Sequence, residues 1–382
     1  MILRKFDYSE YKDEANEWLL DGLILEKINL LVGKNATGKT NSIARINLLS
    51  NILNGILPQL LKSGNYNVEF IDNEDIYRYE LNLSSQRVAH EKLSINNEEK
   101  FIRESNGISQ ISTTQPQEKD TLQLPLNQLV VHPERDARQY PFLVQLIKWA
   151  KSIRLYQFSS PMGKDHLSKN DLSNVYVNPH DMNSVVTLYL HGDKIFPKDF
   201  RKKIVDFMKE IGYELNNIEV DSNPDSFHLD PDFRGVNGLM LYVEEKNIKT
   251  KIFQPQISQG MFRALSIIIH ITYNIMMKEP TTILIDDIGE GLDFERSTKL
   301  IKLLIELAEN NDNIQLTMST NDRFVMNNVP FKYWQLIDRQ GGKCTIYNYQ
   351  NSKEIFDEFK YTGLNNFDFL TTDFIHAERI KN

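Results

Sequence analysis

The segment Gly33–Thr40, with the sequence GKNATGKT, constrains the fold of this chain more than any other feature. It matches the P-loop pattern G-x-x-x-x-G-K-[ST] at every fixed position. An apolar run at residues 23–32 precedes it, and an amphipathic run at residues 41–57 follows it. The sequence therefore predicts a buried strand, a phosphate-binding loop and a helix, in the order that surrounds a phosphate with backbone N–H groups.

The residue types in this loop predict a site for a nucleoside triphosphate. The Lys39 ammonium is expected to neutralise the β- and γ-phosphates, and the Thr40 hydroxyl to bind Mg²⁺. The residues predicted to contact the nucleotide are Gly33, Asn35, Ala36, Thr37, Gly38, Lys39, Thr40 and Asn41. The alternative interpretation is a glycine-bearing turn that matches the pattern by chance. The strand and helix predicted on either side of the loop argue against that alternative.

Composition adds few constraints. The 382 residues are 41% hydrophobic and 25% charged, as expected for a globular chain, and the net charge of −8 gives no general basic field for nucleic acid or membrane. A local basic groove for DNA remains compatible with that charge. The single cysteine, Cys344, excludes an internal disulfide. With no signal peptide or membrane span predicted, we expect a cytoplasmic protein.

The first two thirds of the chain predict a mixed structure. Residues 68–71 and 77–83 alternate like antiparallel strands, and residues 103–123 are rich in polar residues like a loop or linker. Helices are predicted at about 140–155 and 198–211. Residues 220–238 contain proline and glycine and are predicted to be irregular, and no heptad pattern indicates a long coiled coil.

After residue 238 the pattern alternates between strands and helices. Helices are predicted at residues 262–277 and 296–309. Strands are predicted at residues 239–244, 249–253, 281–285, 314–319, 334–337 and 345–347. Such an order favours a mostly parallel sheet with helices on its faces.

Two carboxylates, Asp286 and Asp287, end the apolar strand predicted at residues 281–285. A buried strand holds such side chains rigidly, so Asp286 is a candidate Mg²⁺ ligand and Asp287 is placed to orient or deprotonate an attacking water. The alternative interpretation is a strand that ends in an acidic turn. The P-loop in the same chain favours the metal-binding interpretation.

Two short segments around these carboxylates carry a family resemblance. Residues 257–261, ISQGM, resemble the signature loop of ABC-type ATPases, although Ser-Gln-Gly before a helix is often only a helix cap. Gly291-Leu292-Asp293 resembles the D-loop of that family. Asn321 stands after the next strand, where the family usually has a histidine that senses the γ-phosphate.

The order of P-loop, signature, carboxylates, D-loop and switch strand resembles the SMC/RecF/OLD branch of ABC-type ATPases. The resemblance implies an α/β ATPase head with a mostly parallel sheet flanked by helices, an antiparallel β subdomain and a helical or mixed insertion. We expect the N-terminal half of the head at residues 1–135, the insertion at 136–248, the C-terminal half at 249–350 and a C-terminal tail at 351–382.

In that family two heads enclose two ATP molecules with Mg²⁺. The resemblance therefore implies a homodimer or a higher even oligomer, in which Ser258, Gln259 and Gly260 of one copy contact the nucleotide of the other. Asp287 replaces the usual glutamate and shortens the carboxylate arm by about 1.5 Å, and Asn321 cannot titrate as histidine does. Both departures predict a slow ATPase.

Three roles remain open on the sequence alone. The chain resembles stand-alone ATPase subunits of bacterial anti-phage defence systems, which implies a separately encoded effector protein as partner. The alternatives are a RecF- or SMC-like ATPase for DNA repair or DNA-end binding, and a scaffold that does not hydrolyse ATP. The apolar tail residues around Phe369 are expected to pack on the head or, with less weight, to dock a partner.

Overall fold

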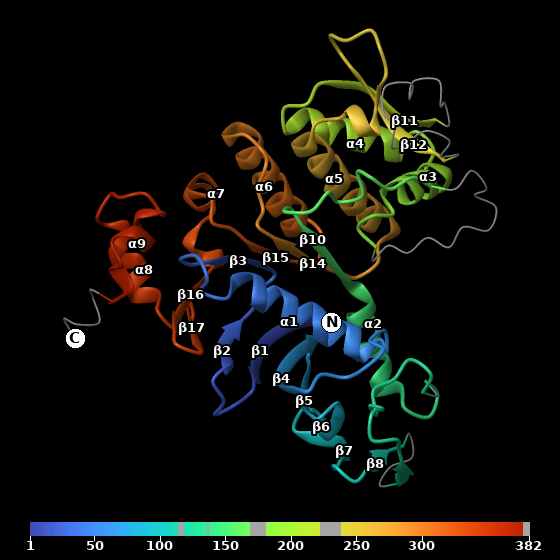
Figure 1. The fold of residues 1–382 in the computed structure, drawn as a ribbon, viewed down its shortest axis with the longest axis vertical. Helices are drawn as coiled ribbons and strands as arrows, with labels where there is room; N and C mark the ends of the chain where they lie inside the picture. The colour runs from blue at the N-terminus through green and yellow to red at the C-terminus, as the bar shows by residue number, and fades with distance from the viewer. Residues whose placement is uncertain (114–117, 136, 169–180, 222–237, 377–382) are drawn as a thin grey trace. The chain divides into compact units, whose positions relative to one another are not determined.

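A computed structural model describes residues 1–113, 118–135, 137–168, 181–221 and 238–376, and the chain divides into two compact units. The first unit contains residues 1–153, 280–284 and 314–382, and the second contains residues 154–279 and 285–313. The chain therefore passes from one unit to the other more than once. Figure 1 shows the elements of both units along the chain.

The first unit is built on one large sheet. Its strands follow the order β14-β15-β3-β16-β17-β2-β1-β4-β5-β6-β7-β8-β9. Their bounds are β1 Ile2–Glu10, β2 Trp18–Ile24, β3 Ile28–Val32, β4 Ser63–Asp72, β5 Asp75–Ser84, β6 Arg87–Ile95, β7 Glu98–Arg103, β8 Ile108–Ser112, β9 Lys119–Gln123, β14 Thr281–Asp286, β15 Ile314–Ser319, β16 Trp334–Gln340 and β17 Lys343–Asn348.

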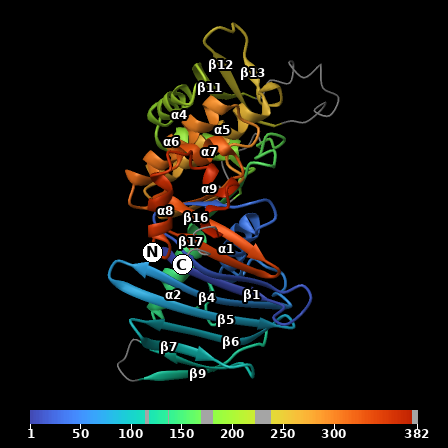
Figure 2. The same cartoon turned by 90° about the vertical axis from the view of Figure 1, so that its left-hand side faces the viewer.

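The sheet changes character along its width. β3 is buried at all five residues and pairs in parallel with β15 and β16, as expected for a strand covered on both faces. Strands β1 and β4 to β9 pair antiparallel, and β5 alternates buried and exposed residues because one face is solvated. Figure 2 shows this antiparallel part. The predicted fold class is confirmed.

Helices of the first unit flank this sheet. They are α1 Lys39–Leu53, α2 Pro141–Ser152, α7 Arg323–Asn328, α8 Lys353–Lys360 and α9 Asp368–Thr371. The predicted strands at 68–71 and 77–83 and the helix near 140–155 are confirmed. The loop predicted at residues 103–123 is wrong in part, because Ile108–Ser112 and Lys119–Gln123 pair as a hairpin in which Gln110 and Gln123 are exposed and Ser109 is buried.

The second unit is mainly helical. Its elements are β10 Ile153–Gln157, α3 Val185–Ile195, α4 Asp199–Glu210, β11 Leu215–Asp221, β12 Met240–Glu245, β13 Ile252–Phe253, α5 Gln259–Met277 and α6 Phe294–Glu309. Strands β11, β12 and β13 form a small antiparallel sheet. The irregular segment predicted at 220–238 falls almost entirely on residues 222–237, which lie outside the described residues.

Helix α5 forms the core of the second unit. It is the one described helix that is long and apolar enough to cross a membrane, yet 72% of its most apolar window is buried. Its contacts are with α3 and α4. Such burial is typical of the central helix of a folded domain.

Candidate functional site

The P-loop joins β3 to α1 in the first unit, and its glycines are required by close packing. A Cβ atom at Gly33 would lie 2.6 Å from the Ile337 carbonyl oxygen and 2.7 Å from Oγ1 of Thr37. Gly38 has a φ of 106°, and Ala36 also adopts a positive φ, of 63°. These left-handed residues curl the backbone into the concave shape that binds anions.

Two side chains of the loop point back onto its own backbone. The Lys39 ammonium donates to the carbonyl oxygens of Gly33 at 2.9 Å and Lys34 at 3.0 Å, and is nearly buried. The Thr37 hydroxyl donates to the Lys34 carbonyl oxygen at 2.9 Å. Because Gly38 precedes α1 and has no side chain, it provides no capping oxygen to the helix N-terminus. This arrangement suits a phosphate group.

Asn321 lies at the same sheet edge as the P-loop. Strand β15 runs parallel to β3, and the Thr320 N–H donates to the Leu31 carbonyl oxygen at 3.3 Å, one residue before Asn321. Asn321 is exposed. The tertiary structure therefore brings together, within the first unit, the P-loop and Asn321, which are almost three hundred residues apart in sequence.

The carboxylate pair belongs to the second unit, at the end of β14. Asp286 is 4% exposed, and its carbonyl oxygen accepts the Phe158 N–H at 3.1 Å. Asp287 adopts a φ of 54°, a left-handed conformation that aspartate tolerates better than most residues. The Glu290 N–H donates to the Asp287 carbonyl oxygen at 3.2 Å, which closes a tight turn after the strand.

The signature segment, residues 257–261, packs directly on the D-loop. A Cβ atom at Gly260 would lie 2.4 Å from the Gly291 carbonyl oxygen, so only glycine fits. The Arg263 guanidinium donates to the carbonyl oxygens of Ser160 and Glu290, both at 3.1 Å. Arg263 thus ties the start of α5 to the D-loop within the second unit.

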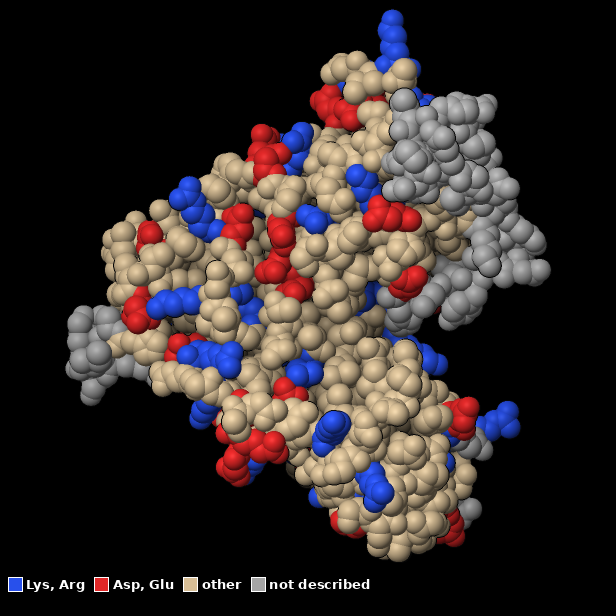
Figure 3. All heavy atoms as spheres, in the orientation of Figure 1, with Lys and Arg blue, Asp and Glu red and all other residues tan. Residues whose placement is uncertain are grey.

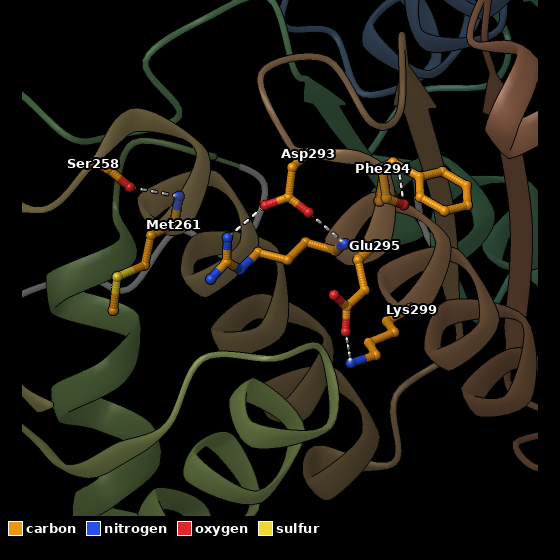
Figure 4. A network of polar contacts seen from close by, with 8 residues as sticks. Ser258, Met261, Asp293, Phe294, Glu295 and Lys299 are labelled. Atoms are coloured by element: carbon orange, nitrogen blue, oxygen red, sulfur yellow. Dashed lines mark hydrogen bonds and ion pairs between the residues drawn. The ribbon is translucent and has the colours of Figure 1, made fainter. Parts of the chain in front are cut away.

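Ser258 and Asp293 each cap a helix, as Figure 4 shows. The Ser258 hydroxyl accepts the Met261 N–H at 3.3 Å. The Asp293 carboxylate accepts the Arg296 N–H at 3.0 Å and also pairs with the Arg296 guanidinium, and these contacts lower the Asp293 pKa. The adjacent Phe294 side chain is 54% exposed. The helix-cap interpretation of the Ser-Gln-Gly segment therefore holds, and Asp293 caps α6 in the same way.

Two further groups of residues in the first unit lie in other surroundings. Phe6 and Tyr8 of β1 are buried in the aromatic core of this unit. Gln86 and Gln128 line a cavity of about 330 Å³ together with Gly55. That cavity adjoins the end of α1 opposite the P-loop.

Sequence reasoning missed one residue, Gln157. It ends β10, directly before Phe158, whose N–H donates to the Asp286 carbonyl oxygen. The sequence signal is a short segment, Ile153–Gln157, that alternates apolar and polar residues up to Tyr156 and ends in glutamine. The helix predicted through residue 155 overlaps this strand and hides it.

The chain is similar to solved structures of SMC heads, although its sequence is very different from theirs. No family model and no curated protein matches the chain. Among solved structures, the SMC head bound to the C-winged helix domain of ScpA is 12% identical, with a TM-score of 0.56 over 93% of this chain and 99% of that chain. The SMC head domain from Thermotoga maritima is 12% identical, with a TM-score of 0.44 over 91% of this chain and 99% of that one.

The first of these likenesses defines the class of fold. The chain has the fold of an SMC head. An identity of 12% shows the fold alone, so the roles of individual residues rest on their chemistry in this chain.

Proposed function

We propose that this protein is an ATP-dependent switch that dimerises around ATP and hydrolyses it slowly. The observation that carries the proposal is the P-loop, where Lys39 is nearly buried against the loop backbone and Gly38 gives α1 no side-chain cap. Phosphate oxygens would replace the carbonyl oxygens as partners of the ammonium.

The remaining motif residues suit the same reaction. Thr40 and Asp286 are the residues that would hold Mg²⁺, and we add Gln157 to this set. When bound, the ion neutralises charge that develops on the phosphates. Asp287 would orient the attacking water, and Ser258, Gln259, Gly260 and Asp293 would contact the nucleotide or the head of the second copy. Asn321 would donate a hydrogen bond to the γ-phosphate.

We further propose a separate effector protein as the partner, in anti-phage defence in the cytoplasm. The likeness to an SMC head whose structure includes the winged helix of ScpA supports a protein partner. DNA repair or DNA-end binding is the competing role. On the face seen in Figure 3, lysine and arginine are interspersed with aspartate and glutamate, which favours a protein partner over DNA.

Light scattering of the full chain with and without ATP tests the proposal. We expect a dimer only with ATP and Mg²⁺, together with phosphate release below about 1 s⁻¹. A monomer at saturating ATP would contradict the sandwich, and a much faster turnover would contradict the switch. ATPase stimulation by DNA that disappears with salt would favour the DNA-binding role.

A further inference from the structure

The C-terminal tail is anchored on the first unit by aromatic packing. Phe369 of α9 is 1% exposed and packs on Phe331 and Trp334, with ring centroids 5.6 and 6.5 Å away. The Asn366 amide donates to the Val329 carbonyl oxygen at 3.0 Å, and the Phe367 N–H donates to Oδ1 of Asn327 at 2.8 Å. Packing of the tail on the head, the preferred expectation, is thus confirmed for Phe369.

The tail tip, residues 372–376, reaches the P-loop. The Asp373 carboxylate lies 3.9 Å from the Lys34 ammonium, an ion pair between tail and loop. His376 bridges two carboxylates, with Nδ1 2.9 Å from Asp373 and Nε2 3.2 Å from Asp338 of β16. Because β16 is the strand next to β3, these contacts fix the tail tip beside the loop.

The space left between the tail tip and the P-loop is small. Lys34 and Thr37 line one side of a cavity of about 30 Å³, and Asp373 and His376 line another. That volume accommodates about one water molecule. The tail tip therefore lies beside this part of the loop, while the Lys34 side chain stays 68% exposed.

The charges of the tail tip oppose an anionic ligand. Asp338 of β16 and Asp373 of the tail tip place two carboxylates next to a loop suited to phosphates. The Asp373 carboxylate already forms an ion pair with Lys34. The neighbouring cations are Lys34, Arg339, which donates to the Ala36 carbonyl oxygen at 3.2 Å, and His376 when protonated. A nucleotide would compete with Asp373 for Lys34 and would be repelled by both carboxylates.

We propose that the tail tip is an autoinhibitory contact, which nucleotide binding displaces from the P-loop through competition for Lys34. The inference rests on the proposed function and adds its regulation. Release of the tail tip would expose it to a partner protein only when nucleotide is bound. A partner protein that captured the free tail would favour the nucleotide-bound state by the same linkage.

The variant Asp373→Asn tests this contact directly. Asp373 has a φ of 51°, which asparagine also tolerates, so the fold should persist. Loss of an exposed ion pair is worth up to about 1 kcal/mol, so we expect ATP to bind about twofold to fivefold more tightly in a titration. The matched control is Asp357→Asn, which removes a carboxylate paired with Lys360 on α8.

Equal ATP affinity in the two variants would overturn the inference, as would weaker binding by Asp373→Asn. Hydrogen exchange provides a second test, because the His376 N–H donates to the Asp373 carbonyl oxygen at 3.0 Å. This amide should exchange faster when ATP is saturating, and unchanged protection would contradict displacement. If the wild-type protein did not bind ATP, the proposed function itself would be wrong.

Discussion

The P-loop of the first unit and the signature segment of the second unit use their motif residues differently. In the P-loop, the Lys39 ammonium turns onto its own backbone, and Gly38 leaves α1 without a side-chain cap. In the second unit, Ser258 and Asp293 each cap a helix. The helix caps account for those two residues by a structural role, whereas the Lys39 ammonium lies inside the concave loop, where phosphate oxygens would take the place of its carbonyl partners. Phosphate binding is therefore better supported at the P-loop.

The largest expected effect is the loss of ATP affinity in the P-loop variant Lys39→Ala. Replacing Lys39 with alanine removes a charged donor, which is worth about 1.5–3 kcal/mol. We expect ATP affinity to fall by about 10- to 100-fold in calorimetric titration. Lys92→Ala, which removes a lysine of β6 paired with Glu99, is the matched control and should bind ATP normally. If Lys39→Ala and Lys92→Ala bound ATP with equal affinity, the P-loop would have no better claim to a ligand than the signature segment.

The Asp287→Asn variant tests ATP hydrolysis separately from ATP binding. Asparagine tolerates the left-handed backbone at this position, so Asp287→Asn should fold and bind ATP. We expect phosphate release to fall about tenfold or more, and the ATP-bound dimer to accumulate in light-scattering measurements. Glu290→Gln is the control in the same turn. Unchanged turnover in Asp287→Asn would show that another group activates the water.

Ser258 tests whether the signature residue is more than a helix cap. Ser258→Ala should lower the free energy of unfolding by about 1 kcal/mol, whereas Ser258→Asn retains a capping oxygen and should keep stability. If Ser258 also contacts nucleotide across the dimer, both variants should weaken ATP-dependent dimerisation, by about fivefold. A Ser258→Asn protein that dimerises normally would reduce this residue to its structural role.

The smallest effect concerns pH at the tail tip. The hydrogen bond with Asp373 and the charge of Asp338 raise the pKa of His376. The protonated form therefore stabilises the tail contact, fully below the ordinary pKa of about 6.5, and this stabilisation is lost as pH rises through the raised pKa. Lys34 opposes protonation through its own charge, while Asp338 and Asp373 favour it.

ATP titrations near pH 6 and near pH 8.5 check that sign. The affinity advantage of Asp373→Asn over the wild type should be greatest at the lower pH and should shrink by about twofold at the higher pH. In a His376→Gln background the pH dependence of this advantage should disappear. An advantage that grows with pH would contradict a histidine-stabilised contact.

Local patterns predicted the elements that lie closest to the motifs. The strand predicted at residues 314–319 is β15, Ile314–Ser319, and the helix predicted at 262–277 is α5, Gln259–Met277. Periodicity succeeds there because β15 alternates apolar and polar residues along its length and α5 is a long, mostly apolar helix. It failed at residues 103–123, where polar side chains on an exposed hairpin have the composition of a loop.

The sequence by itself determined the P-loop, the order of the motifs and the class of fold, because glycine spacing, charge and apolar periodicity are local properties. Only the tertiary structure decided that Phe6 and Tyr8 are core residues, that Gln157 ends a strand beside Asp286, and that Asp373 of the tail tip pairs with Lys34. Those facts depend on which distant segments share a sheet edge or a packed surface, and sequence spacing does not encode such contacts.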